Sequence, residues 1–419
     1  MSEPKTLKLP VTKLLVGMFV DLELPWTKHP FLFSRFKITR QQDIDTIQNL
    51  GLDSVSIILA KCDRKAIQTP QPAPQSAPEP ISADAMWAEK KAHMDKAEGY
   101  RERHNSVATK YRAQADKVRN IARALKSEPA NAIRDADEVV EGLAREFDDT
   151  SDLLTNLVNL GSGAHSFYNH NVNVTVLSLM LGAAAGLKGE ALRQLAMGGL
   201  MHDIGKIELP TQITGKVGRL TVAEANILKQ HPSVGRKLTE RIRTLPKMAQ
   251  AIIEFHHELL DGSGYPHGIG GARIPKQVQI VSICNIYDNL CNAQNPADSL
   301  TPKLALATLY KKFQGKLDPQ LLELFIHTMG VYPPGSVVRL NDDSIGLVVA
   351  VNPRNILRPE LLIYNPEVSR QEALIINLEE HAELAVEEVL KPGHYPSRIY
   401  AYLGIEERLG YFVERGPSG

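Results

Sequence analysis

The sequence has few cysteines, no excess of either charge and no long apolar run. Its three cysteines, Cys62, Cys284 and Cys291, follow neither a zinc-binding nor a disulfide spacing, which indicates a reducing compartment. Lys plus Arg number 48, as do Asp plus Glu, so no basic excess points to DNA or RNA as a partner. No window approaches the roughly 18 apolar residues of a membrane span, and the start lacks the apolar region of a signal peptide. We therefore expect a soluble, cytoplasmic protein that binds neither nucleic acid polymers nor a membrane.

The first part of the chain is predicted to be a small domain followed by a linker. Residues 5–65 combine strand-like runs, such as SVSIILA, with a helical segment that ends at Gly51. This pattern predicts a small N-terminal α/β domain. Residues 66–82 are rich in Pro, Ala and Gln and cannot bury enough apolar surface to offset the entropy of ordering. They are predicted to be a linker.

The rest of the chain is predicted to be mainly α-helical. Residues 83–130 are charged and nearly free of Gly and Pro, which favours a long exposed helix, either a spacer or one partner of a helical pair. Residues 131–330 contain successive apolar-periodic segments between short turns, which predicts a helical bundle. Residues 331–419 contain β-rich runs around polar turns and are predicted to form a short C-terminal β-rich extension.

Polar residues that can bind metal ions concentrate in the predicted bundle. Six of the 13 histidines belong to this block: His170, His202, His231, His256, His257 and His267. His202 and Asp203 follow an apolar, small-residue helix that should pack deep inside. A single histidine on such a helix is usually a hydrogen-bonded core residue. A buried carboxylate without a partner, however, costs several kcal/mol, and a cation removes that cost.

Imidazole and carboxylate ligands together suit divalent transition metals such as Fe, Mn, Ni, Zn or Co. The two oxygens of one carboxylate can bridge two ions about 3.5–4 Å apart. Such a pair holds a phosphoryl oxygen and activates water near neutral pH. Facing helices of a bundle can supply the ligands from separate segments. The pattern therefore predicts a dinuclear metal centre for phosphoryl chemistry.

Three motifs in order, HDIGK, HPSVG and HHELLDGSGYPHG, resemble the HD-GYP family of bacterial HD-type metal phosphohydrolases. The resemblance covers roughly residues 150–340. It implies a helical-bundle HD domain that hydrolyses the bacterial second messenger cyclic di-GMP to pGpG and possibly onward to GMP, with two or three metal ions. The front of the chain, with GMFV and PW followed by HPF, is similar to the uncharacterised N-terminal domain that accompanies many HD-GYP proteins.

The resemblance also implies roles for individual residues. His170 matches the first metal histidine, His202 and Asp203 match the HD pair, and Asp203 is the bridging carboxylate. Lys206 matches the lysine that holds the substrate phosphate. The histidines that serve the second metal are matched by His231, His256 and His257, without a division of individual rings between ions. The signature loop, which would lie against the substrate, is matched by Asp261, Gly262, Gly264, Tyr265 and Pro266, with glycines for a tight turn and a stiff Tyr-Pro step. His267 is expected to be exposed.

Three positions depart from the family pattern. Ser166 stands where family members with three metals have a glutamate, which favours two metal ions here. Asn285 stands where the family has its last metal-ligand aspartate, and a carboxamide is a weaker, neutral ligand. Asp288 lies one turn further along the same helix, 5–6 Å away by helical geometry, and would need a shifted helix to replace it. Gln294 occupies the region in which the family usually has a phosphate-binding arginine.

These departures leave three interpretations open. The first is an active two-metal phosphodiesterase for cyclic di-GMP. The second is a weak or inactive module that binds cyclic di-GMP or a partner protein, because Asn285 replaces the aspartate. The third is an HD phosphohydrolase for another nucleotide. Contact with diguanylate cyclase domains, which the resemblance implies for the signature loop, is compatible with the first two interpretations. The charged helix also suggests a homodimer.

Overall fold

The computed structural model describes residues 6–63, 82–160, 167–295, 298–352, 354–390 and 396–405, without the side chains of residues 146–160. The chain forms two compact units. The first unit comprises Met1–Tyr100, Leu340–Ile345 and Leu362–Ile376, and the second comprises Arg101–Arg339, Gly346–Leu361 and Asn377–Gly419. The predicted linker lies almost entirely outside the described residues, and the predicted domain boundaries remain predictions.

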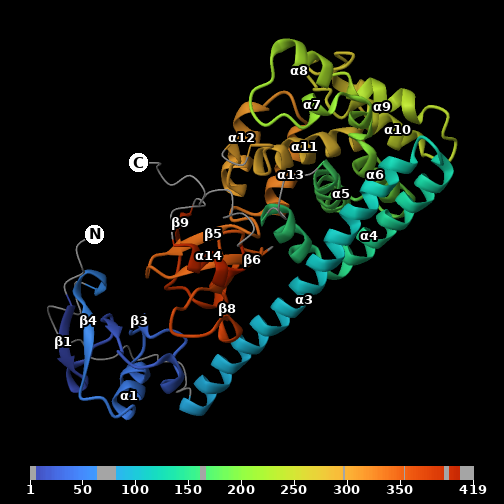
Figure 1. The fold of residues 1–419 in the computed structure, drawn as a ribbon. Coiled ribbons are helices and arrows are strands. Elements are labelled where there is room, and N and C mark those ends of the chain that lie inside the picture. The colour runs from blue at the N-terminus through green and yellow to red at the C-terminus, as the bar shows by residue number, and fades with distance from the viewer. Residues whose placement is uncertain are drawn as a thin grey trace, which may run out of the picture. The chain divides into compact units, whose positions relative to one another are not determined.

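The first unit contains a four-stranded antiparallel sheet with one helix (Figure 1). The strand order is β1-β4-β2-β3, and Val20 pairs with Ile57. Alternate apolar residues of the strands and helix form the core, including Val20, Ile47 and Ile57. The elements are β1 (Thr6–Pro10), β2 (Phe19–Asp21), β3 (Arg35–Lys37), α1 (Gln41–Asn49) and β4 (Ser54–Ile58). The predicted N-terminal α/β architecture is confirmed.

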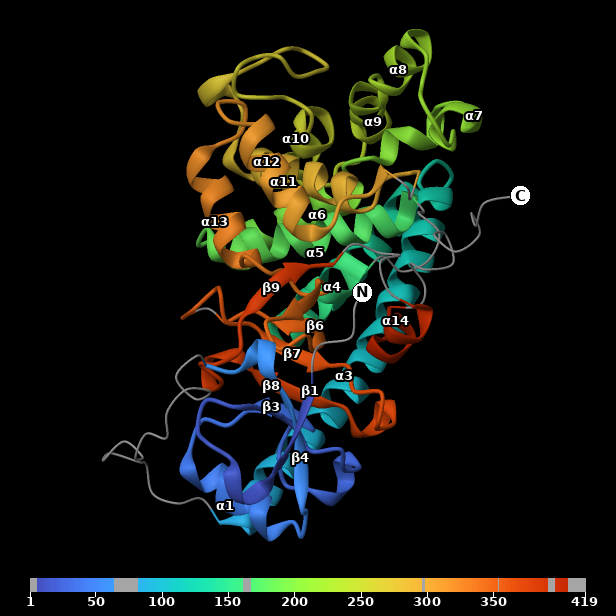
Figure 2. The same ribbon diagram turned by 90° about the vertical axis from the view of Figure 1, so that its left-hand side faces the viewer.

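Two long helices follow, α3 (Ala83–Ala124) and α4 (Pro129–Leu160). The first part of α3, up to Tyr100, belongs to the first unit, and its remainder belongs to the second unit. There α3 and α4 lie side by side, and Gly142 of α4 approaches the Gln114 side chain of α3 (Figures 1 and 2). The expected charged helix is therefore present, but α3 is not exposed all round. A stripe at helical spacing is buried: Val107, Tyr111, Ala115 and Val118.

The second unit is a helical bundle around α5 (Phe167–Ala184). Every residue of α5 from His170 to Gly182 is buried, which fits a helix that is apolar on all sides. Helix α5 packs against α4, α6, α11 and α13. The other bundle helices are α6 (Gly189–Met201), α7 (Thr211–Thr214), α8 (Val222–Leu228), α9 (His231–Thr239), α10 (Lys247–Phe255), α11 (Lys276–Cys291), α12 (Pro302–Lys312) and α13 (Pro319–Met329).

Small residues of α6 allow the bundle helices to approach closely. A Cβ atom on Gly198 would lie 2.3 Å from Ile252 Cδ1 of α10, and one on Gly199 would lie 3.3 Å from Thr175 Cα of α5. Helix α6 therefore ends deep inside the bundle, which places His202 and Asp203 in a buried position.

The chain ends in strands, as the sequence predicted. A five-stranded sheet has the order β8-β7-β6-β5-β9. Its strands are β5 (Val337–Leu340), β6 (Ile345–Ala350), β7 (Glu360–Ile363), β8 (Leu374–Asn377) and β9 (Val386–Val389), and α14 (Ser397–Leu403) follows. The mainly helical fold class with strands at both ends is confirmed.

Among the described residues, no helix has both the length and the apolar character that a bilayer crossing needs.

Candidate metal centre

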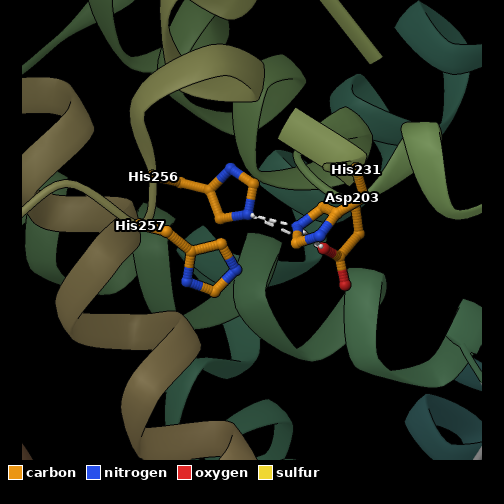
Figure 3. A group of neighbouring side chains, drawn as sticks. All are labelled: Asp203, His231, His256 and His257. Carbon is orange, nitrogen blue, oxygen red and sulfur yellow. Dashed lines mark hydrogen bonds and ion pairs between the residues drawn. The ribbon is translucent and has the colours of Figure 1, made fainter. Parts of the chain in front are cut away.

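Four helical segments bring most of the predicted metal ligands together. His170 lies in the first turn of α5, and His202 and Asp203 follow the end of α6. His231 begins α9, while His256 and His257 follow the end of α10. All of these side chains are buried except that of His257, which is half-buried. Figure 3 shows His231, His256 and His257 around Asp203.

The ligand atoms form two groups that share Asp203. One group is Asp203, His231, His256 and His257, and the other is His170, His202 and Asp203, with the atoms of each group within 4.8 Å of one another. Asp203 Oδ1 lies 3.0 Å from His231 Nε2 and 3.6 Å from His256 Nε2. Asp203 Oδ2 lies 3.5 Å from both His170 Nε2 and His202 Nε2. Each carboxylate oxygen therefore faces a different pair of rings.

Hydrogen bonds at Nδ1 fix the tautomer of four rings. His202 Nδ1 donates to Gly199 O (2.7 Å) and His231 Nδ1 donates to Leu228 O (2.7 Å). His256 Nδ1 lies 3.1 Å from the carbonyl oxygens of both Ile252 and Ile253. His170 Nδ1 donates to Asp288 Oδ2 at 2.6 Å. Because carbonyl and carboxylate oxygens only accept here, the proton of each neutral ring sits on Nδ1, and Nε2 presents a lone pair.

These lone pairs point at one another. His170 Nε2 lies 3.2 Å from His202 Nε2, and His231 Nε2 lies 3.1 Å from His256 Nε2. Two unprotonated nitrogens cannot form a hydrogen bond, and Asp203 Oδ1 also accepts none. A buried set of lone pairs directed at one carboxylate is unfavourable by itself and is satisfied by cations. The donor set of imidazoles and carboxylate therefore fits divalent transition metals.

Burial keeps these groups in the protonation states that bind metal. Burial lowers the pKa of His202 and His257 well below their ordinary value, and that of His256 to a lesser extent. For Asp203, burial alone would raise the pKa. The Lys206 ammonium, which pairs with Asp203 Oδ2, instead holds the pKa of Asp203 well below its ordinary range. The site therefore presents the neutral rings of His202, His256 and His257 beside the ionised carboxylate of Asp203.

Lys206 is placed by a contact that only glycine permits. It lies in the short 3-10 helix Ile204–Glu208, which packs on α9. A Cβ atom on Gly205 would lie 2.0 Å from His231 O and 2.5 Å from Gly235 N. Glycine at position 205 therefore allows the backbones to touch, and this contact sets Lys206 beside Asp203 and His231 beside the same carboxylate.

The predicted signature loop contributes its tyrosine ring to the centre. Tyr265 stacks on His257 with ring centroids 4.5 Å apart and lies edge-on to His231 at 6.4 Å. Burial raises the pKa of the Tyr265 hydroxyl, so it stays protonated. The Tyr265–Pro266 peptide bond is cis. At Gly264 a Cβ atom would lie 2.5 Å from His257 O, so glycine allows the loop to fold back on the histidine pair.

Asp261 and His267 of the same loop are exposed and have partners other than the predicted metal ligands. Asp261 is exposed, and its Oδ1 accepts hydrogen bonds from Ser263 N (3.0 Å) and Ser263 Oγ (2.6 Å). Asp261 thus closes the turn that Gly262 passes through at φ 77°. His267 is exposed, as expected, and pairs with Glu254 at 3.0 Å. Within the loop, Tyr265 is the residue whose ring contacts the predicted ligands.

Asn285 and Asp288 lie on the same helix, as expected, and each has a side-chain partner. Asn285 is buried in α11, and its Oδ1 accepts a hydrogen bond from Asn289 Nδ2 at 2.7 Å, so the predicted ligand atom already has a partner. Asp288 is not among the grouped ligand atoms, and it instead accepts a hydrogen bond from His170 Nδ1. The sequence hypothesis missed this role. The sequence signal for this role was the i, i+3 spacing of Asp288 from Asn285, which places both on one helix face. This spacing does not distinguish a carboxylate that binds a metal ion from one that accepts a hydrogen bond from a histidine ring.

Two further positions complete the comparison with the sequence. Gln294 Nε2 donates to Thr214 O at 3.1 Å, which connects α11 to α7. Ser166 lies outside the described residues.

Two protein families match the chain. Residues 6–136 match a domain of unknown function, DUF3391, and residues 152–321 match the HD domain. The chain is 26% identical over 360 residues to cyclic di-GMP phosphodiesterase PA4108 of Pseudomonas aeruginosa. This alignment covers 85% of this chain and 84% of the relative.

Two other relatives match a shorter part of the chain. The cyclic di-GMP phosphodiesterase response regulator RpfG of Xanthomonas campestris is 35% identical over 34% of this chain and 38% of its own length. Cyclic di-GMP phosphodiesterase PdeB of Borreliella burgdorferi is 28% identical over 44% of this chain and 49% of its own length. The chain therefore has a DUF3391 domain ahead of an HD domain of the metal-dependent phosphohydrolase type, and it is similar to proteins named cyclic di-GMP phosphodiesterases.

Proposed function

We propose that the chain hydrolyses cyclic di-GMP to linear pGpG, with GMP as a possible final product. The observation that carries the proposal is the convergence of four Nε2 lone pairs on Asp203, with Lys206 and Tyr265 at the same place. The relatives named cyclic di-GMP phosphodiesterases support the choice of substrate.

Two divalent transition ions, of Fe, Mn, Ni or Zn, would be held by the two groups that share Asp203. His170 and His202 would serve one ion, and His231, His256 and His257 the other, with Asp203 between them. Bound ions supply Lewis acidity toward a phosphoryl oxygen and lower the pKa of water.

The chain's own side chains would position the substrate and the ligands. Lys206 is half-buried beside Asp203 and offers an ammonium to a phosphate oxygen. The Nδ1 hydrogen bonds hold each ring with its lone pair inward and prevent reorganisation during the reaction. In the loop, Asp261, Gly262, Gly264 and Pro266 would set the backbone that places Tyr265 on His257 and would lie against the substrate.

A second function has an observation in its favour: binding of cyclic di-GMP or a partner protein with weak or no hydrolysis. Asn285 supplies a neutral amide where an anionic ligand is expected, and its oxygen is engaged by Asn289. Diguanylate cyclase domains, or a second copy of this chain, would be the protein partners of such a module.

The test is to purify the full chain without chelator, count the metal ions and follow conversion of cyclic di-GMP to pGpG with Mn²⁺ or Fe²⁺. We expect about two ions per chain and turnover. Asp203→Asn should remove both the ions and at least about 10³-fold of the rate, because both groups lose their shared anion. Fewer than one ion per chain together with no turnover would leave only the binding function. Cleavage of a different nucleotide instead would overturn the choice of substrate.

Asn285→Asp separates the two functions. If the neutral amide limits the site, the added carboxylate should raise metal affinity and turnover together. Gln277→Glu adds the same charge near the start of α11, away from the site, and serves as the matched control. An equal gain in both variants would show a general charge effect and not a missing ligand.

A further inference from the structure

A line of buried polar side chains joins α3 to the metal centre through α5 and α11. The Tyr111 hydroxyl of α3 donates a hydrogen bond to Asn173 Oδ1 of α5. Asn173 Nδ2 donates to Asp288 Oδ1 of α11 at 2.7 Å, and His170 Nδ1 donates to Asp288 Oδ2 at 2.6 Å. Tyr111, Asn173, Asp288 and His170 are exposed by only 2%, 5%, 0% and 3%. Water therefore does not compete for these bonds.

The direction of every bond in this line is fixed by chemistry. A carboxylate only accepts, so Asp288 requires the nitrogen of the Asn173 amide on its side. The amide oxygen must then face Tyr111, whose hydroxyl supplies the proton. A flipped amide would place its oxygen against the Asp288 carboxylate, where two acceptors repel. The Tyr111 hydroxyl thus stabilises the one amide orientation that supports Asp288.

Asp288 in turn determines which nitrogen of His170 is free. The carboxylate holds the proton on Nδ1, so Nε2 faces His202 and Asp203 with its lone pair. Asn292 Nδ2 gives Asp288 Oδ1 a further donor at 2.8 Å. Several donors fix the position of a buried carboxylate, which orients the attached imidazole and makes it a stronger ligand.

The other group of ligands is supported differently. His231 and His256 donate their Nδ1 protons to backbone carbonyls of their own helical segments. In the described part of the chain, a side-chain carboxylate at Nδ1 is found for His170 but not for these two rings. His170 therefore depends on α3 through side chains, while His231 and His256 depend on local backbone.

We propose that Tyr111 and Asn173 are positioning residues of the metal centre, acting through Asp288 on His170. They set the affinity of the His170–His202–Asp203 position for a divalent transition metal and leave the other position unaffected. The inference rests on the proposed metal-dependent function, but it concerns cation binding and not hydrolysis.

The test is a titration of the metal-free full chain with Co²⁺, followed by its visible absorption, and with Mn²⁺ in competition with a chelator. Tyr111→Phe removes one hydroxyl and keeps the ring. It should weaken one of the two binding steps by roughly 10–100-fold and leave the other unchanged. Asp288→Asn should weaken the same step at least as much, and it gives a second measurement if Tyr111→Phe folds poorly.

Val118→Ala is the matched control, since it removes buried volume from the same helix without touching the polar line. It should lower thermal stability but keep both binding steps. Equal affinities in Tyr111→Phe and the parent would overturn the proposal, as would an equal loss in Val118→Ala. Because cation binding is measured without substrate, a protein that binds both ions but does not cleave cyclic di-GMP would overturn the proposed activity and leave this inference standing.

Discussion

Each buried ring of the metal centre has two nitrogens with opposite tasks. Nδ1 gives its proton to a fixed acceptor, so Nε2 keeps a lone pair for a ligand. A protonated ring would lose this lone pair and would need its charge buried. Residues with such fixed tautomers bind metal without first reorganising. Burial has a different consequence for a histidine of the first unit.

His29 makes the first unit sensitive to acid. It is fully buried, and burial, followed by the nearby Lys90 charge, lowers the pKa of His29 to about 4. The unfolded chain binds this proton at its ordinary pKa near 6.5, so stability is lost as the pH falls from 6.5 to 4. The loss is on the order of 3 kcal/mol. Both tryptophans, Trp26 and Trp87, belong to the first unit, so fluorescence during thermal unfolding reports this effect.

His29→Gln should reduce that acid loss. The amide does not titrate, so its curve of stability against pH should be flatter between pH 6.5 and 4. A variant that loses as much stability as the parent would assign the acid sensitivity to another group.

The sequence predicted which residues gather at the metal centre but not the hydrogen bonds that orient them. His202 and Asp203 stand in a strong motif, and the rings from other segments could be expected to join them, as the structure shows. Their roles as ligands stay a prediction. The partners of Nδ1 could not be predicted, because Gly199 O or Leu228 O is a backbone atom that any residue provides. The contact between Asp288 and His170 was not predicted, because helical spacing gives the face of a residue but not the side chain that it meets.

At the scale of elements, close backbone contacts hold the centre together. The Ile204–Glu208 segment touches α9 at Gly205, and the signature loop touches the residues after α10 at Gly264. Both contacts are made by residues without a Cβ atom, next to residues that face the site. Close backbone contacts therefore fix the ends of the elements that carry the predicted ligands, and at these ends the ligands from different helices meet.

Gly205→Ala should disrupt the contact with α9. The new Cβ would lie 2.0 Å from His231 O, a backbone atom that cannot turn away. We expect a loss of about 3 kcal/mol or more in the free energy of unfolding, with lower metal content, measured by denaturant unfolding and metal analysis.

Gly142→Ala is the matched control for this substitution. Its Cβ would meet only the end of the flexible Gln114 side chain at 3.2 Å, and alanine favours a helix interior. It should stabilise the protein by up to about 1 kcal/mol. Similar losses in both variants would contradict the role given to the α9 contact.

Local elements were more predictable than their pairing. The charged composition predicted α3, and alternation predicted strands after Gly330, because both signals lie within one segment. The sheet order β8-β7-β6-β5-β9 places β9 beside β5, although three strands intervene in the chain. Such a pairing depends on contacts between distant residues, which the periodicity of one segment does not contain.

At the scale of the whole molecule, the two units respond to different conditions. All predicted metal ligands belong to the second unit, whereas both tryptophans belong to the first. Addition of Mn²⁺ at about 100 times its dissociation constant should stabilise the second unit by about 3 kcal/mol. That corresponds to roughly 5–10 °C in calorimetry, with less change in the tryptophan transition. An unchanged calorimetric transition would contradict metal binding by the folded chain.

The ion pair between Lys206 and Asp203 has a consequence for how the protein takes up its ligands. Without cations, the ammonium is the nearest neutralising charge for a buried anion. In the proposed function, cations bound at this carboxylate would release the ammonium, which would then be free to attract a phosphate ester. Loading with metal and capture of an anionic ligand are therefore thermodynamically linked, and each must tighten the other by the same factor.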